Sequence, residues 1–204
     1  MAHDVVTWQS RDDRPNEDHI VHLYGATWED YERLLAIRGD RSAPRITFLK
    51  GTLEVMSPSR NHENIKSIIG CLVEVWCLEN EVRFTTLGSW TIKDRAEERG
   101  AEPDECYLFG DAGEDVQRPD LAIEVVWTSG GLHKLEVYRK LDVREVWYWR
   151  QGILRPHALR DDERYEEVAA SEVLPGIDLV QLASFLDRPT TYDAIRDYRA
   201  ALRD

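Results

Sequence analysis

Two segments of the chain repeat their apolar residues at helical spacing. Between Trp28 and Arg38 apolar side chains recur every three or four positions, and Thr27 can cap the segment with Asp30 completing a capping box. After Ser57-Pro58-Ser59 the same spacing continues to about Glu79. The pattern therefore predicts helices over residues 28–38 and 60–79, each with one face in the core.

Shorter apolar or alternating runs between these helices are typical of strands. We predict strands over residues 45–49, 52–56, 82–86, 90–92, 105–109, 121–127, 144–149, 153–159 and 164–169. Further helices are predicted over about 132–141, 180–187 and 190–202. Residues 1–26 are polar and predicted to be irregular, and the charged stretch DRAEERGAEP is predicted to be a loop. Strands flanked by helices indicate the α/β (mixed α+β) class.

The length and composition fit one globular domain over residues 1–204. Hydrophobic residues make up 42% of the 204, enough for a sizeable core. No window approaches the roughly 20 apolar residues of a membrane span, and the first residues do not read as a secretory signal. The three cysteines cannot all pair within the chain, and Cys71 and Cys77 fall on different faces of one predicted helix. We therefore expect a cytoplasmic protein without a membrane partner.

The charge balance restricts the partners. Asp and Glu number 39 against 26 Lys and Arg, which gives a formal net charge of -13. Proteins that grip phosphate backbones usually present a basic patch, because neutralised phosphates supply most non-specific affinity. A nucleic-acid function would therefore need a local site, where a bound metal ion makes the electrostatic potential positive.

Acidic residues at strand positions are the remaining candidates for chemistry, since the sequence has no phosphate loop with a lysine, no G-x-S-x-G, no Cys-x-x-Cys and no H-E-x-x-H. Asp104 opens one predicted strand, and Glu124 lies within the apolar run LAIEVVW. Burying Glu124 is costly unless it meets a cation, and a neighbouring arginine or a solvated strand face would also explain it. Two carboxylates and Lys134, in the first turn of the next helix, can assemble a Mg²⁺-dependent phosphodiester-cleaving site.

The order of several sequence blocks resembles one family. The blocks are TWEDYERLL, RITFLKGTLEVMSPSRNHENIKSIIG, EPDECY, PDLAIEVVWTSGGLHKLEVYRKLDVREVWYW and VLPGIDLVQLASFL. Over residues 20–190 they resemble the Uma-two family of the PD-(D/E)XK restriction-endonuclease-like superfamily. The resemblance implies a central mixed β-sheet flanked by helices and a nuclease site that uses Mg²⁺ or Mn²⁺.

The resemblance also implies roles for individual residues. Asp104 of EPDECY corresponds to the acid of the PD motif, and Glu124 to its (D/E) position; both would bind the metal. The superfamily lysine usually lies two residues after that acid, where this chain has Val126. The family's lysine in the following helix matches Lys134, with Lys140 as the alternative.

A second Pro-Asp pair, Pro119-Asp120, competes for the role of Asp104. Asp120 and Glu124 share one predicted strand and lie about 13 Å apart, too far to share one metal ion. Asp104 comes from a separate strand and can lie beside Glu124, while its neighbour Glu105 should face the other side.

Two further residues are candidates to line the site. Glu54 matches a carboxylate of this family branch, although alternation leaves it facing either the site or solvent. His62 matches a recurrent histidine and shares a helical face with Lys66; a polar helix start would also explain it. Four cations flank this region and are candidates for local positive charge: Arg45, Lys50, Arg60 and Lys66.

These observations predict a metal-dependent endonuclease that hydrolyses nucleic-acid phosphodiester bonds, with DNA as the expected partner. A non-catalytic binding or regulatory module that retains the fold is the alternative. Cleavage of RNA or of a small nucleotide would better suit the acidic composition. A homodimer is expected from the resemblance alone.

Overall fold

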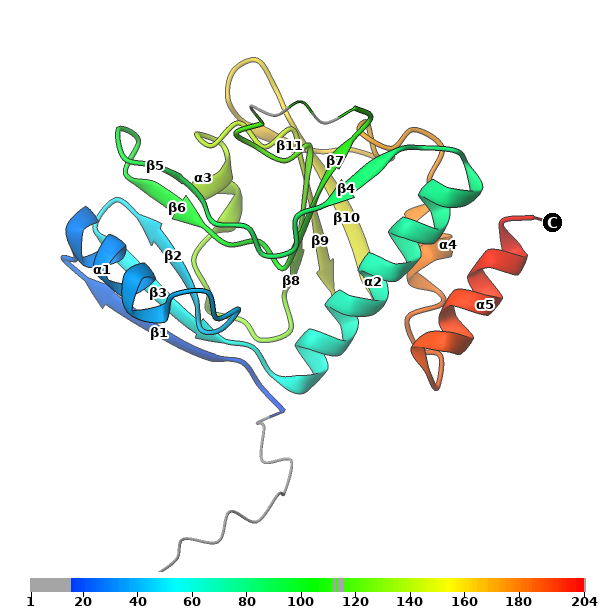
Figure 1. The fold of residues 1–204 in the computed structure, drawn as a ribbon, viewed down its shortest axis with the longest axis horizontal. Helices are drawn as coiled ribbons and strands as arrows, with labels where there is room; N and C mark the ends of the chain where they lie inside the picture. Colours follow the sequence, from blue (N-terminus) through cyan, green and yellow to red (C-terminus); the bar gives the residue numbers. More distant parts are fainter. Residues whose placement is uncertain (1–15, 112, 114–115, 204) are drawn as a thin grey trace, which may run out of the picture.

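The computed structural model describes residues 16–111, 113 and 116–203, and this part of the chain has the predicted mixed α+β class (Figure 1). The helices are α1 (Trp28–Arg38), α2 (Arg60–Glu79), α3 (Lys134–Tyr138), α4 (Leu179–Ala183) and α5 (Thr191–Ala201). The strands are β1 (His19–Tyr24), β2 (Arg45–Leu49), β3 (Thr52–Ser57), β4 (Phe84–Thr86), β5 (Ile92–Asp94), β6 (Arg99–Ala101), β7 (Glu105–Phe109), β8 (Leu121–Val125), β9 (Glu145–Arg150), β10 (Ile153–Leu159) and β11 (Tyr165–Glu167).

Local signals place the two long helices where they were predicted. Thr27 and Asp30 form the capping box of α1, and the Ser59 side chain accepts the N–H of His62 at the start of α2. Two predictions were wrong. Residues 19–24, predicted to be irregular, form β1 against β3, and residues 99–101 of the charged stretch form the buried strand β6. The prediction for residues 1–15 lies outside the described residues.

The strands divide into two sheets, whereas the family resemblance implied one central sheet. The five-stranded sheet has the order β1-β3-β2-β6-β5 and is antiparallel. The six-stranded sheet has the order β11-β10-β9-β8-β7-β4 and is mixed, because β8 pairs with β9 in parallel. The six-stranded sheet corresponds to the predicted mixed sheet, and the five-stranded sheet faces it.

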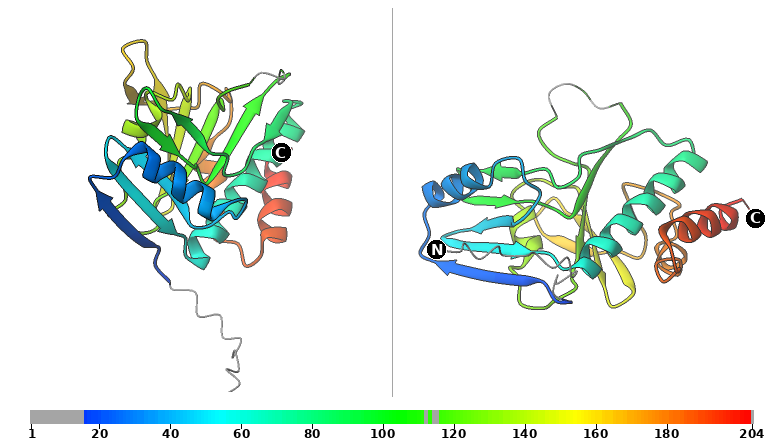
Figure 2. Two further views of the ribbon diagram at one scale, coloured as in Figure 1. Left: turned by 60° about the vertical axis from the view of Figure 1, so that its left-hand side comes forward. Right: turned by 60° about the horizontal axis from the view of Figure 1, so that its bottom comes forward.

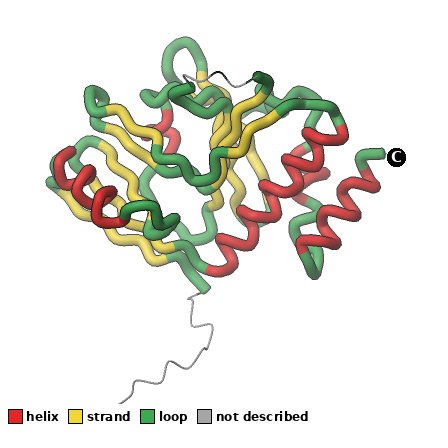
Figure 3. Tube along the Cα trace, viewed as in Figure 1, coloured by secondary structure: helices red, strands yellow, loops and turns green. Residues whose placement is uncertain are grey.

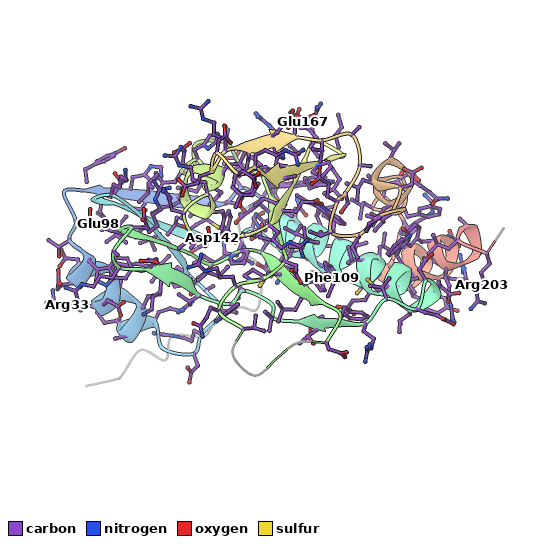
Figure 4. The ribbon with its side chains drawn as sticks, turned by 90° about the horizontal axis from the view of Figure 1, so that it is seen from above. Arg33, Glu98, Phe109, Asp142, Glu167 and Arg203 are labelled. Carbon is purple, nitrogen blue, oxygen red and sulfur yellow. The ribbon has the colours of Figure 1, made fainter. Side chains whose placement is uncertain are left out.

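Helices cover one face of the five-stranded sheet and pack on both faces of the six-stranded sheet (Figure 2). Trp28 and Tyr31 of α1 pack on the five-stranded sheet. Helices α2, α4 and α5 cover one face of the six-stranded sheet, and its other face packs against α3 and the β5–β6 hairpin. Most helical residues thus lie at the two ends of the molecule, with the strands between them (Figure 3). At the outer end, Arg203, labelled in Figure 4, ties the end of α5 to Glu79 of α2.

Strand alternation decides which side chains enter the space between the sheets. On β2, Ile46 and Phe48 join the core under α1, so Arg45 and Thr47 point to the opposite face. On β8, Ile123 and Val125 join the core under α2, so Glu124 points toward the five-stranded sheet. Polar residues of both sheets therefore face one another. Among the described residues, no helix is long and apolar enough to cross a bilayer.

Candidate active site

Asp104 lies beside Glu124, immediately before β7. The register of β7 and β8 ends where Glu105 pairs with Ile123. Asp104 then makes two hydrogen bonds to the residues on either side of Glu124: its N–H donates to the Ile123 carbonyl at 3.1 Å, and its Oδ2 accepts the Val125 N–H. Both side chains are buried, at 1% and 5% exposure, so the solvated-face explanation of Glu124 is wrong.

Two cations hold the Asp104 carboxylate. Its Oδ1 pairs with a guanidinium nitrogen of Arg45 and with His62 Nε2 at 2.9 Å, and its Oδ2 accepts the Val125 N–H. Arg45 also pairs with Glu63 Oε1 at 2.7 Å. Burial opposes the charge of Asp104, but Arg45 and His62 outweigh it and hold the pKa well below its usual range. Asp104 is therefore ionised at neutral pH.

His62 forms a bridge between two carboxylates. Its Nδ1 lies 3.0 Å from Asp18 Oδ2, and Asp18 in turn accepts the Ser59 N–H at 2.8 Å. Burial opposes a charged imidazole, yet Asp104 and Asp18 raise the pKa of His62 to about 9. At neutral pH the imidazolium donates to both carboxylates, which fixes the orientation of Asp104.

Lys134 reaches from the first residue of α3 to the five-stranded sheet. Thr47 and Glu54 are direct partners on β2 and β3, and the lysine ammonium donates to Thr47 Oγ1 and lies 3.1 Å from Glu54 Oε1. The Leu132 N–H donates to the other oxygen of Glu54. Burial alone would lower the pKa of Lys134. The negative charges of Glu124 and Glu54 outweigh this effect and raise the pKa above its usual value, so the side chain remains an ammonium.

Among the buried carboxylates of this site, Glu124 makes no ion pair with a described residue. The other three carboxylates around the site are paired with cations: Asp18 with His62, Asp104 with Arg45, and Glu54 with Lys134. Glu124 accepts only the hydroxyl of Tyr138 in the part of the chain that the structure describes. Burial and the charge of Asp104 raise the pKa of Glu124 to about 7, against the attraction of Lys134.

A cavity of about 450 Å³ gives access to these groups. Glu54, His62, Glu124 and Lys134 line it on the side of the two sheets. The loop of residues 128–133, with its two glycines, lines the other side, and Arg150 and Arg155 also contribute. The volume suits a small ligand or part of a larger one.

The acid pair fits a divalent cation that keeps part of its water shell. Asp104 Oδ2 accepts one N–H and retains a lone pair, and Glu124 Oε2 makes no hydrogen bond to a described residue. Within residues 16–111, 113 and 116–203, no group of three or more His, Cys, Asp or Glu could hold a metal. Mg²⁺ typically uses one or two carboxylates and several waters, and Mn²⁺ accepts similar oxygen ligands.

The structure separates the alternative candidates from this cavity. Asp120 accepts the Phe109 N–H at 2.9 Å and pairs with Arg144, so it has a structural role. Lys140 pairs with Glu163. Two of the cations expected to provide local positive charge, Arg45 and Lys66, are ion-paired with carboxylates of this region.

Sequence reasoning missed the partners that hold the candidate residues. Tyr138 lies four residues after Lys134, so helical spacing could have placed both on one face of α3. Arg45 was expected as a source of local positive charge, but Thr47 was not; both alternate with the apolar residues of β2, which marks a polar inner face. Asp18 carried no such signal, because its role depends on contacts made through β1.

Two buried acids in a mixed α+β fold, one of which lines the cavity together with a lysine, are the arrangement of a nuclease-like protein. The chain belongs to the Uma2 family, described as "Putative restriction endonuclease", whose model matches residues 28–187. Among solved structures, the chain resembles "a putative nuclease belonging to DUF820" from Anabaena variabilis. The two share 14% identity over 80% of this chain and 96% of that one, with a TM-score of 0.47. No curated protein matches the chain.

Proposed function

We propose that the protein is a metal-dependent endonuclease that hydrolyses phosphodiester bonds of DNA. The observation that carries the proposal is Glu124: a buried carboxylate that makes no ion pair with a described residue, lies beside the ionised Asp104 and lines a cavity. Such an excess of buried negative charge is unfavourable until a cation neutralises it. Membership in a restriction-endonuclease family supports phosphodiester hydrolysis as the use of that cation.

The chain's own residues would divide the work. Asp104 and Glu124 would hold Mg²⁺ or Mn²⁺, while His62 and Tyr138 fix the orientation of their carboxylates. When bound, the ion supplies Lewis acidity toward a phosphoryl oxygen and acidifies a water molecule.

Lys134 would stabilise negative charge that develops on the phosphate. Its pKa is raised by Glu124 and Glu54 despite burial, so at neutral pH it is an ammonium and not a base. Glu54 and Thr47 hold this ammonium in place from the five-stranded sheet. This assigns Glu54 the role of positioning Lys134.

Calorimetric titration with Mg²⁺ and Mn²⁺ tests the metal site. We expect binding to wild type and none to Asp104→Asn. Asp120→Asn is the matched control, because it changes the other Pro-Asp pair outside the cavity. Circular dichroism of each variant establishes that it is folded.

Cleavage of plasmid DNA with added Mg²⁺ or Mn²⁺ tests the activity. Asp104→Asn should abolish cleavage, Lys134→Gln should abolish it while metal still binds, and Asp120→Asn should retain it. Cleavage by a folded Asp104→Asn variant would contradict the assignment. Wild type that neither binds metal nor cleaves would favour a non-catalytic binding module.

A further inference from the structure

A second depression lies beyond the carboxyl ends of β8 and β9, on the α2 side of the six-stranded sheet. This groove has a volume of about 610 Å³ and is mainly apolar. Its lining includes Ile65 of α2, Leu186, and the indoles of Trp127 and Trp149. The site described above does not use it.

The two indoles form a flat aromatic surface. Their rings stack with centroids 5.8 Å apart and planes 4° from parallel. Trp149 is buried, while Trp127 is 37% exposed and donates its Nε1–H to the Asn16 carbonyl at 2.7 Å. The stacking on Trp149 and the hydrogen bond to Asn16 thus hold the Trp127 indole in place, while its exposed part remains accessible to a planar ligand.

The groove adjoins the cavity that Glu124 lines. Val126 lines both depressions, and Arg150 of the cavity is the sequence neighbour of Trp149 and Gln151, which line the groove. Arg150 is exposed and makes no ion pair with a described residue. From Glu124 to Trp127 the extended chain covers about 10 Å, comparable to the rise of roughly three stacked nucleotides.

We propose that the groove binds a base of single-stranded DNA, which stacks on Trp127 while Arg150 contacts the phosphate between that base and the acid pair. The proposal rests on the nuclease function proposed above and specifies its substrate. Aromatic stacking needs an unstacked base. A single strand also has a lower charge density than a duplex, so it is the better partner for a protein with a net charge of -13. A long duplex would instead require a basic surface.

Fluorescence anisotropy with labelled oligonucleotides tests this site. Wild-type protein in EDTA, which prevents metal-dependent cleavage, is titrated into labelled oligothymidylate, an abasic strand of equal length, and a duplex. We expect the oligothymidylate to bind about tenfold more tightly than the abasic strand and the duplex. Equal affinity for the three probes, or no binding at all, would overturn the proposal.

Variants locate the binding. Trp127→Ala should weaken binding of oligothymidylate about tenfold, and Trp127→Phe should restore most of it. Tyr192→Ala removes another exposed aromatic ring, on α5, and should have no effect. The logarithm of the DNA affinity falls linearly with the logarithm of the salt concentration, and Arg150→Gln should reduce the magnitude of this slope by about 0.7. Arg33→Gln on α1, labelled in Figure 4, is the control and should leave the slope unchanged. An unchanged affinity in folded Trp127→Ala would exclude this groove.

These results separate the two proposals. Metal-dependent cleavage of DNA with no Trp127-dependent binding would leave the nuclease standing and reject the stacking site. Trp127-dependent binding without cleavage would reject the nuclease and retain a site for single strands.

Discussion

Replacing Glu124 by glutamine should stabilise the metal-free protein while abolishing metal binding. The carboxyl is buried beside Asp104, and its pKa is raised from 4.5 to about 7. A raised carboxyl pKa means that folding opposes ionisation, so the cost is absent below pH 4.5 and fully present above pH 7. The shift corresponds to about 3 kcal/mol at most. Glutamine keeps the acceptor for the Tyr138 hydroxyl and carries no charge.

Urea unfolding in EDTA at about pH 4.5 and about pH 8.5 measures this effect. Relative to wild type, Glu124→Gln should gain up to about 3 kcal/mol only at the higher pH, which is a rise in Tm of roughly 6–12 °C for a chain of this length. Added Mg²⁺ should stabilise wild type and leave Glu124→Gln unchanged.

Asp104→Asn is the matched comparison, because Asp104 lies beside Glu124 but has a lowered pKa. This substitution should destabilise the protein at the higher pH, the reverse of Glu124→Gln. If Glu124→Gln gained nothing between the two pH values, the reasoning about an unpaired buried carboxylate would be refuted.

Three further predictions concern the partners of the acid pair. His62→Gln should lower the unfolding free energy of the metal-free protein by about 3 kcal/mol near pH 6.5. This difference should vanish as the pH rises through about 9, because the imidazolium of the wild type then loses its proton and its stabilising contribution. Urea unfolding across this pH range measures the difference. Arg45→Met should cost about 3 kcal/mol by chemical unfolding, because it leaves a buried carboxylate, whereas Arg83→Met, which breaks an exposed pair, should cost less than about 1 kcal/mol. Tyr138→Phe removes the donor to Glu124, so calorimetry should show Mg²⁺ binding that requires a higher pH than in wild type; an unchanged pH dependence would contradict this.

The sequence was most informative where local interactions decide the structure. Helices α1 and α2 follow from apolar spacing and from the caps at Thr27 and Ser59, which act within one turn. The placement of Asp104 beside Glu124 also follows from local rules, because Glu124 lies within one short strand and Asp104 immediately precedes the neighbouring one. By contrast, Arg99–Ala101 carries no strand signal and becomes β6 only through its pairing with β2 and β5.

The contacts that give the site its charge pattern were beyond the sequence. Arg45 reaches an acid 59 positions away, and Lys134 reaches a threonine 87 positions away. Such pairs depend on how the two sheets face each other, and periodicity within one segment holds no information about that arrangement. Glu124 was recognisable as anomalous from its apolar neighbours, but only the structure shows that the cations nearby are held by other carboxylates.

The division of the site between two sheets also sets the order in which a newly made chain can become active. Glu54, His62 and Asp104 all precede β8 in the chain, so these residues leave the ribosome first. Asp104 can then be neutralised by Arg45 and His62 before Glu124 exists. The acid pair and its lysine require β8 and α3, and β9 must follow to cover β8 in parallel. A shorter nascent chain therefore lacks the acid pair, and the capacity to cut DNA that we propose arises only after β9 has been made.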